Sequence, residues 1–217
     1  MAERALEYLK DFVAIPSVNP IGRSDISEEI VGEAAYAGHL QAELGRLGID
    51  AALVGSPDRP SVVAEIRRSV PGLETVLVAS HLDTVPVDGM EIPPFDPRLE
   101  SGKLYGRGSC DTKAGMAALV AALERVLGRG ELARNLILVG EADEELGSQG
   151  VRDVLNALGE RRPDWVLATE PTEMKVACSH KGVVHVRMEA RGHAVHASNP
   201  AEGKNAIVLL SRAAIAL

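Results

Sequence analysis

A histidine and several carboxylates occur at four places in the sequence, and most of them directly follow an apolar run. His81 and Asp83 come after TVLVA, and Glu170 ends the segment DWVLATE. The acidic run EADEE at 141–145 follows NLILVG, and Asp111 begins an alanine-rich segment. One imidazole and several carboxylate oxygens form a donor set that suits a divalent metal ion.

Each of these places also has a structural interpretation when it is taken alone. His81 and Asp83 can form a local hydrogen bond, Asp111 can cap its helix, and 141–145 can be a solvated acidic turn. Their joint occurrence favours a metal site. Four carboxylates in five residues repel one another, and a bound cation relieves that repulsion.

The apolar periodicity predicts the elements that must position these residues. Helices are predicted over 3–15, 27–47, 111–127 and 148–158, the second with a capping box at Asp25 and Glu28. Strands are predicted over 50–54, 61–66, 74–80, 102–107, 135–141 and 164–170, the last one buried. This order indicates an α/β fold, with a mixed, mostly parallel sheet and helices on both faces. Ligands of such sheets gather at the carboxyl ends of the strands, where three of the four places lie.

The pattern changes after Pro171. Residues 183–192 alternate between apolar and polar side chains, as in a half-exposed strand. A loop then leads into an apolar helix over 205–217. We therefore expect a catalytic metal-binding domain over 1–180 and the start of a second domain over 181–217.

Composition excludes several other classes of protein. The formal net charge of −8 disfavours a nucleic-acid partner, which requires a basic face. The charged amphipathic N-terminus is unlike a signal peptide, and no apolar run reaches the length of a membrane span, so the cytoplasm is the expected location. The two cysteines form no CxxC pair, and we interpret Cys110 as a small buried thiol. We interpret His39 as a surface or packing residue. His180, His185 and His193 lie on or beside the strand predicted over 183–192, and we do not expect them to contact a substrate.

Five segments together resemble a known family of hydrolases. They occur in the order HLDTVP (81–86), YGRGSCDTKAGMAA (105–118), DEELGS (143–148), ATEPT (168–172) and GHAVHASNPAEGKNAI (192–207). They closely resemble the dinuclear zinc amidohydrolases and peptidases that include acetylornithine deacetylase, succinyl-diaminopimelate desuccinylase, aminoacylase and carboxypeptidase G. The resemblance covers residues 1–217 and implies a zinc exopeptidase-like fold followed by the beginning of an α+β lid domain that also dimerises.

The resemblance implies metal ligands at four positions. His81 and Glu170 resemble ligands of a first zinc ion, and Glu145 resembles a ligand of a second. Asp111 resembles the carboxylate that bridges the two ions, and the peptide bond after it is often cis in the family. Asp83 resembles the carboxylate that fixes the tautomer of His81.

The resemblance also implies the reaction. Glu144 resembles the general acid/base, and His196 resembles a lid histidine that reaches the active site of a partner subunit. We therefore expect hydrolysis of the amide bond of N-acyl amino acids or small peptides, acetylornithine deacetylase-like, by a metal-activated water. Two Zn²⁺ ions are expected, with Co²⁺ or Mn²⁺ as alternatives. The full-length form is expected to be a homodimer that binds neither nucleic acid nor membrane.

A competing hypothesis remains open. Relatives run to roughly twice this length, and no histidine follows His196 to complete the second zinc site. On that hypothesis the chain is a fragment or a truncated, non-catalytic homologue that binds metal weakly and associates through the helix at 205–217. A metal-dependent phosphohydrolase fits less well, because nothing in the sequence resembles a phosphate cradle.

Overall fold

The computed structural model describes residues 1–68, 70–184 and 186–217. The chain divides into two compact units, Met1–Met174 and Lys175–Leu217. All but one of the candidate residues belong to the first unit, and His196 belongs to the second.

A five-stranded sheet forms the centre of the first unit, in the order β1-β2-β6-β3-β7. Its strands are β1 (Ala51–Ser56), β2 (Arg59–Ile66), β3 (Thr75–His81), β6 (Asn135–Glu141) and β7 (Trp165–Ala168). β3 runs parallel to both β6 and β7, whereas β2 is antiparallel to β1 and β6. Four of the five strands therefore point the same way, and the prediction of a mixed, mostly parallel sheet is confirmed.

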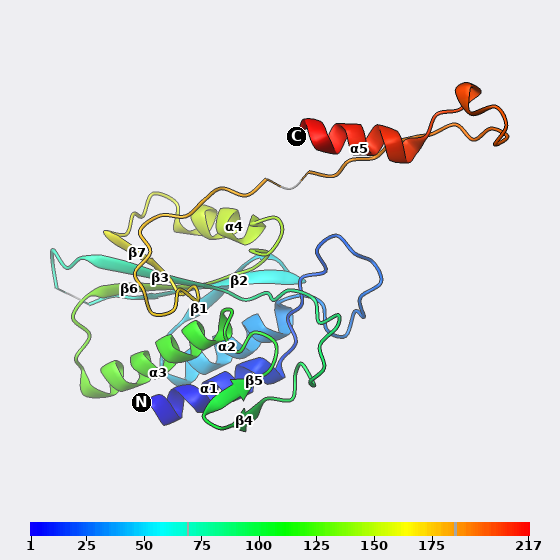
Figure 1. Cartoon of the computed structure of the whole chain (residues 1–217). Helices are drawn as coiled ribbons and strands as arrows, with labels where there is room; N and C mark the ends of the chain where they lie inside the picture. Colours follow the sequence, from blue (N-terminus) through cyan, green and yellow to red (C-terminus); the bar gives the residue numbers. More distant parts are fainter. Residues whose placement is uncertain (69, 185) are drawn as a thin grey trace. The chain divides into compact units, whose positions relative to one another are not determined.

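Helices cover both faces of this sheet (Figure 1). One face carries α1 (Ala2–Ala14), α2 (Ala34–Arg46) and α3 (Lys113–Arg129), and the other carries α4 (Gln149–Leu158). The short strands β4 (Arg98–Glu100) and β5 (Lys103–Tyr105) form a separate hairpin. The expected α/β architecture is thus confirmed, and α4 begins one residue from its predicted start.

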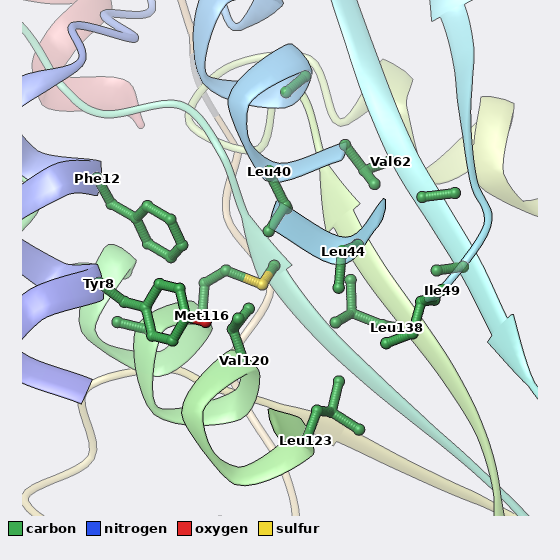
Figure 2. Packing of buried hydrophobic residues seen from close by; sticks show 14 of the residues in the cluster. Tyr8, Phe12, Leu40, Leu44, Ile49, Val62, Met116, Val120, Leu123 and Leu138 are labelled. Carbon is green, nitrogen blue, oxygen red and sulfur yellow. The ribbon is translucent and has the colours of Figure 1, made fainter. Parts of the chain in front are cut away.

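The main core lies between the sheet and the three helices of one face (Figure 2). Each helix turns an apolar stripe inward, with side chains three or four residues apart. The cluster includes Tyr8, Phe12, Leu40, Leu44, Val62, Met116, Val120, Leu123 and Leu138. A smaller cluster lies on the opposite face, where Val154 and Leu158 of α4 pack against β2, β3 and β6. Burial of each large side chain contributes about 1.5–3 kcal/mol, and this packing fixes the ends of the strands.

The helix predicted over 27–47 begins only at Ala34. Val31 forms a parallel bridge with Val18 instead, and Gly32 has a φ of +91°, a left-handed conformation that ends helical continuation. Glu33 is fully buried and pairs with Arg59. The capping box predicted at 25 and 28 is therefore wrong, because contacts with distant segments determine the conformation of this stretch.

The strand predicted over 164–170 is present as β7, but it is exposed and not buried. The exposed fractions of Trp165, Val166 and Leu167 are 62%, 68% and 56%. β7 is one of the two edge strands of the sheet, and an edge position leaves apolar side chains uncovered where no helix packs on them.

The second unit contains the 3₁₀ turn η1 (Pro200–Glu202) and helix α5 (Ala206–Ala216). Asn205 caps α5 by accepting hydrogen bonds from the backbone N–H groups of Ile207 and Val208, at 2.9 and 3.2 Å. The strand predicted over 183–192 is absent from the described residues of that stretch, and His185 lies outside them. Among the residues of this unit that the structure describes, β-type pairing is limited to an isolated bridge between His193 and Lys204. In the described part of the chain, no helix has both the length and the apolarity needed to cross a bilayer.

The ammonium group of Lys113 is buried at the point where α3 meets the end of α1. Its Nζ donates to the carbonyl oxygens of Phe12 and Ile15, at 3.0 and 2.6 Å, and lies 4.5 Å from the centre of the Tyr36 ring. Burial lowers the pKa of Lys113 to about 7. The carbonyl oxygens at a helix C-terminus and the ring face act in the opposite direction, because both favour the charged form.

We expect Lys113→Met to lower the free energy of unfolding by about 1–3 kcal/mol, because a buried carbonyl loses its partner. Urea denaturation measures this difference. Lys103→Met, at an exposed position of β5, is the matched control and should leave stability almost unchanged. Equal effects of the two substitutions would show that the hydrogen bonds of Lys113 to the end of α1 do not stabilise the fold.

Candidate metal centre

The carboxyl ends of β3, β6 and β7 lie level with one another in the sheet. His81, the last residue of β3, is in register with Glu141 at the end of β6, and Ala79 is in register with Ala168 at the end of β7. The turn that carries Glu144 and Glu145 follows β6. The segments that bear the candidate residues therefore leave the sheet at the same edge.

Three candidate ligands meet at this edge. One ligand atom each from His81, Asp111 and Glu145 lie within 4.8 Å of one another. His81 Nε2 is 2.9 Å from Asp111 Oδ1 and 4.0 Å from Glu170 Oε1. Ligands about 2.1 Å from a tetrahedral zinc ion lie roughly 3.4 Å apart. The chemistry and spacing of these side chains therefore fit a divalent cation.

Asp83 fixes the orientation of the His81 ring through the ring nitrogen that faces away from Asp111. Its Nδ1 lies 2.8 Å from the backbone carbonyl oxygen of Asp83 and 3.5 Å from Oδ1 of the same residue. An N–H at Nδ1 donates to that carbonyl, and in the neutral ring the Nε2 lone pair would then be free to bind a cation. The buried Asp83 carboxylate accepts hydrogen bonds from the backbone N–H groups of Glu144 and Glu145, both at 3.1 Å. Asp83 therefore ties the end of β3 to the turn that carries Asp143, Glu144 and Glu145, which we call the acidic turn.

Electrostatics at this edge favour a cation. Burial opposes the charged form of His81, but Asp83 and Asp111 outweigh it and raise the pKa of His81 to about 10. Burial also acts against ionised Asp83, yet the His81 hydrogen bond lowers the pKa of that carboxyl. Burial and neighbouring carboxylates raise the pKa of Glu145 to about 7 and also raise the pKa of Glu170. A divalent ion offsets this mutual repulsion of carboxylates.

The segment around Asp111 is held against the end of β3. The peptide bond between Asp111 and Thr112 is cis, as the resemblance implied. Thr112 Oγ1 donates to the carbonyl oxygen of His81 at 3.2 Å and lies 2.9 Å from Ser80 Oγ. In the next turn of the chain, a Cβ at Gly115 would overlap the side chain of Thr169. Close packing of α3 on the segment before Glu170 thus brings two candidate ligands together.

Gly150 allows α4 to begin directly against the backbone of the acidic turn. A Cβ at Gly150 would overlap the backbone N and O atoms of Ala142 and the hydroxyl of Ser61, and backbone atoms cannot move aside cheaply. We expect Gly150→Ala to lower the free energy of unfolding by about 1–3 kcal/mol, as overpacking does. Urea denaturation provides the measurement.

Gly128→Ala is the matched control for that substitution. Gly128 lies in the last turn of α3, and nothing is within 4 Å of the position of its Cβ. Alanine there should stabilise the helix by about 0.5–1 kcal/mol. If Gly150→Ala stabilised the protein as well, the packing of α4 on the acidic turn would not be as described.

The adjacent glutamates differ in exposure. Glu144 is exposed and Glu145 is half-buried, so one carboxylate faces solvent while the other lies among the candidate ligands. A hollow of about 260 Å³ opens beside Glu145 and Asp111 and is also bordered by Arg107 and Cys110. Cys110 is exposed and borders the hollow, which corrects its interpretation as a buried thiol.

The other histidines lie as follows. The His39 ring packs edge-on against Phe12, with ring centres 5.9 Å apart, which confirms a packing role. His180 is exposed, and the backbone of His193 forms the bridge already described. His196 is exposed in the second unit, with its Nδ1 2.8 Å from Ser198 Oγ. Its role at an active site stays a prediction.

Sequence reasoning missed the residues that support the acidic turn from behind, above all Asn19 and Arg59. Asn19 Nδ2 donates to Asp83 at 2.8 Å, and Arg59 donates to Asp143 at 2.9 Å. Asn19 stands before a proline in an apparent loop, and Arg59 stands in an apparent surface turn. Neither position carries a local signal, because the partners are 64 and 84 residues away.

Comparison with known proteins gives consistent matches. The profile of peptidase family M20/M25/M40 matches residues 77–215. A peptidase M20 domain-containing protein of Schizosaccharomyces pombe is 36% identical over 65% of this chain and 34% of its own length. The acetylornithine deacetylase of Pasteurella multocida is 34% identical over 74% of this chain and 41% of its own length. The chain thus spans between a third and about two fifths of these relatives.

Solved structures agree with the sequence matches. The crystal structure of a metallo-carboxypeptidase from Sulfolobus solfataricus is similar to this chain with a TM-score of 0.65 and 28% identity. That similarity covers 76% of this chain and 37% of the solved one.

Proposed function

This chain belongs to peptidase family M20/M25/M40, and on that basis we propose that it forms the metal-binding part of a zinc-dependent enzyme that hydrolyses amide bonds. The observation that carries the proposal is the donor set of His81, Asp111 and Glu145, whose ligand atoms lie within 4.8 Å of one another at the carboxyl edge of the sheet. Glu170, 4.0 Å from His81, adds a further carboxylate.

We assign the roles of the ligands as follows. His81 and Glu170 would hold one cation, Glu145 would hold a second, and Asp111 would contribute its carboxylate to both. The 2.9 Å contact between Asp111 and His81 and the proximity of Glu145 support this assignment. Asp83 keeps His81 and the acidic turn in place through its backbone carbonyl and its carboxylate.

Glu144 is the general base of the proposed reaction. When bound, the cations supply positive charge that polarises the scissile carbonyl and makes water a stronger acid. The exposed carboxylate of Glu144 takes a proton from the attacking water and then gives a proton to the departing amine. His196, in the second unit, is proposed to stabilise the oxyanion in a partner subunit.

The proposed substrates are N-acyl amino acids or small peptides, with acetylornithine deacetylase-like activity as the first choice. This choice is supported by the 34% identity to an acetylornithine deacetylase. A homodimeric full-length form, a cytoplasmic location and a lid that begins in residues 181–217 belong to the same proposal and follow from the resemblance.

The test compares metal-free protein with protein reloaded with Zn²⁺, Co²⁺ or Mn²⁺. Hydrolysis of N-acetylornithine, other N-acetyl amino acids and dipeptides is followed by the appearance of free amine. Activity should return with metal and vanish again with chelator. Stoichiometric metal binding without hydrolysis of any amide would favour the competing function.

The competing function is that of a non-catalytic metal-binding homologue that associates through α5. Apolar side chains on α5 support it, since the exposed fractions of Ile207 and Ile215 are 77% and 86%. Exposed apolar residues of this kind favour association. Sedimentation of the protein with Ile207→Ser and Ile215→Ser tests this alternative, which requires loss of association in the double variant.

A further inference from the structure

A network of charged and amide groups lies behind the turn that carries Glu144 and Glu145. Glu33 is fully buried and binds Arg59 through two parallel hydrogen bonds, Nε to Oε2 at 2.8 Å and Nη2 to Oε1 at 2.7 Å. Glu33 Oε1 also accepts the backbone N–H of Asp143 at 3.0 Å. A single buried carboxylate therefore contacts both the arginine and the first acidic residue of the turn.

Asp143 is held by its side chain as well. Its Oδ1 accepts from Arg59 Nη1 at 2.9 Å and from Asn19 Nδ2 at 3.1 Å. The same amide group of Asn19 donates to Asp83 Oδ2 at 2.8 Å. Asp143 has a φ of +61°, a left-handed conformation that is unfavourable for most residues other than glycine. The hydrogen bonds of this network hold the turn in that conformation.

The conformation at Asp143 determines where the next two residues go. Their backbone N–H groups both donate to the Asp83 carboxylate, and Asp83 is itself tied to His81. The network therefore links the support of the turn to the position of Glu145 relative to His81.

We propose that Arg59 is a positioning residue, which acts together with Glu33 and Asn19 to set the conformation of the acidic turn and thereby the affinity for the cation that Glu145 binds. Arg59 is placed in contact with no candidate ligand; it acts through Asp143. The inference rests on the proposed function, since it concerns how the same site is built.

The planar fork of arginine is essential to this role. Its Nε and Nη2 contact Glu33 while its Nη1 contacts Asp143. A lysine carries the same charge but cannot make these three bonds in a fixed plane. Without a cationic side chain between them, the carboxylates of Glu33 and Asp143 repel each other. The turn then moves away from β2.

The experiment compares Arg59→Gln and Arg59→Lys with the control Arg4→Gln. Arg4 also contacts two carboxylates, Glu124 and Glu7, but it does so on the exposed surface of α1. Zinc affinity is measured by titration against a competing chelator. Backbone hydrogen exchange is measured in the metal-free proteins.

Both Arg59 variants should bind zinc about 10–100-fold more weakly, as expected when a residue that supports metal ligands is lost. Arg59→Lys should retain more affinity than Arg59→Gln. Exchange should accelerate within 143–148 and stay unchanged in the core strands. Arg4→Gln should match the wild type in both measurements.

Wild-type zinc affinity in both Arg59 variants would overturn the inference. Faster exchange throughout the chain would also overturn it, because that result indicates a general structural role. If Arg59→Gln did not fold, Arg59→Lys would carry the comparison. Failure of the wild type to bind zinc would overturn the proposed function, whereas the exchange data, recorded without metal, would still decide whether Arg59 orders the turn.

Discussion

Replacement of Glu144 by glutamine is expected to lower kcat by about 10²–10⁴-fold, the usual contribution of a positioned general base. The amide keeps the size of the side chain but cannot accept a proton. The Glu144 side chain is exposed, and it is the backbone N–H of this residue that binds Asp83, so metal binding and stability should not change.

Steady-state kinetics on the best substrate, with metal content determined in parallel, measures this effect. Glu160→Gln, at an exposed position after α4, is the matched control and should retain full activity. Full activity of Glu144→Gln would refute the assignment of Glu144 as the base. Loss of activity together with loss of metal would instead make Glu144 a ligand.

Replacement of Asp111 by asparagine is expected to weaken zinc binding by more than about 100-fold, beyond the loss caused by a residue that only supports ligands. Asp111 is the candidate ligand closest to His81 Nε2, at 2.9 Å. Its carboxylate supplies negative charge to both proposed ions, and an amide supplies none. Activity should fall with the metal content.

Chelator competition and metal analysis measure the binding, and urea denaturation checks the fold. Asp96→Asn, at an exposed loop position, is the matched control. The assignment of Asp111 would be wrong if the asparagine variant retained two ions per chain or bound zinc as tightly as the wild type.

The central strands could be predicted from sequence because their apolar runs are bounded by turns. β3 and β6 were expected within one residue of their observed ends, since both lie in the middle of the sheet and are apolar on both sides. The start of the helix predicted over 27–47 was wrong because Glu33 pairs with an arginine 26 residues away. The exposure of β7 was missed because an apolar run does not reveal whether its strand lies at an edge.

The candidate ligands could be anticipated because parallel strands bring their carboxyl ends to one edge. His81 ends such a strand, and Glu145 and Glu170 follow two others, so the strand order is almost enough to predict that they lie close together. Asp111 reaches the same edge through the close packing of α3 at Gly115, which no periodicity encodes. Arg59 was not identified because a charged residue in a turn looks the same whether it is solvated or paired.

A crystal structure of the zinc-loaded protein, with anomalous diffraction data collected at the zinc edge, would locate the metal ions. We expect an anomalous peak about 2.0–2.2 Å from His81 Nε2 and from carboxylate oxygens of Asp111 and Glu170, with a second peak beside Glu145. Zinc-loaded protein without an anomalous peak at this edge of the sheet would show that these residues do not form the metal site.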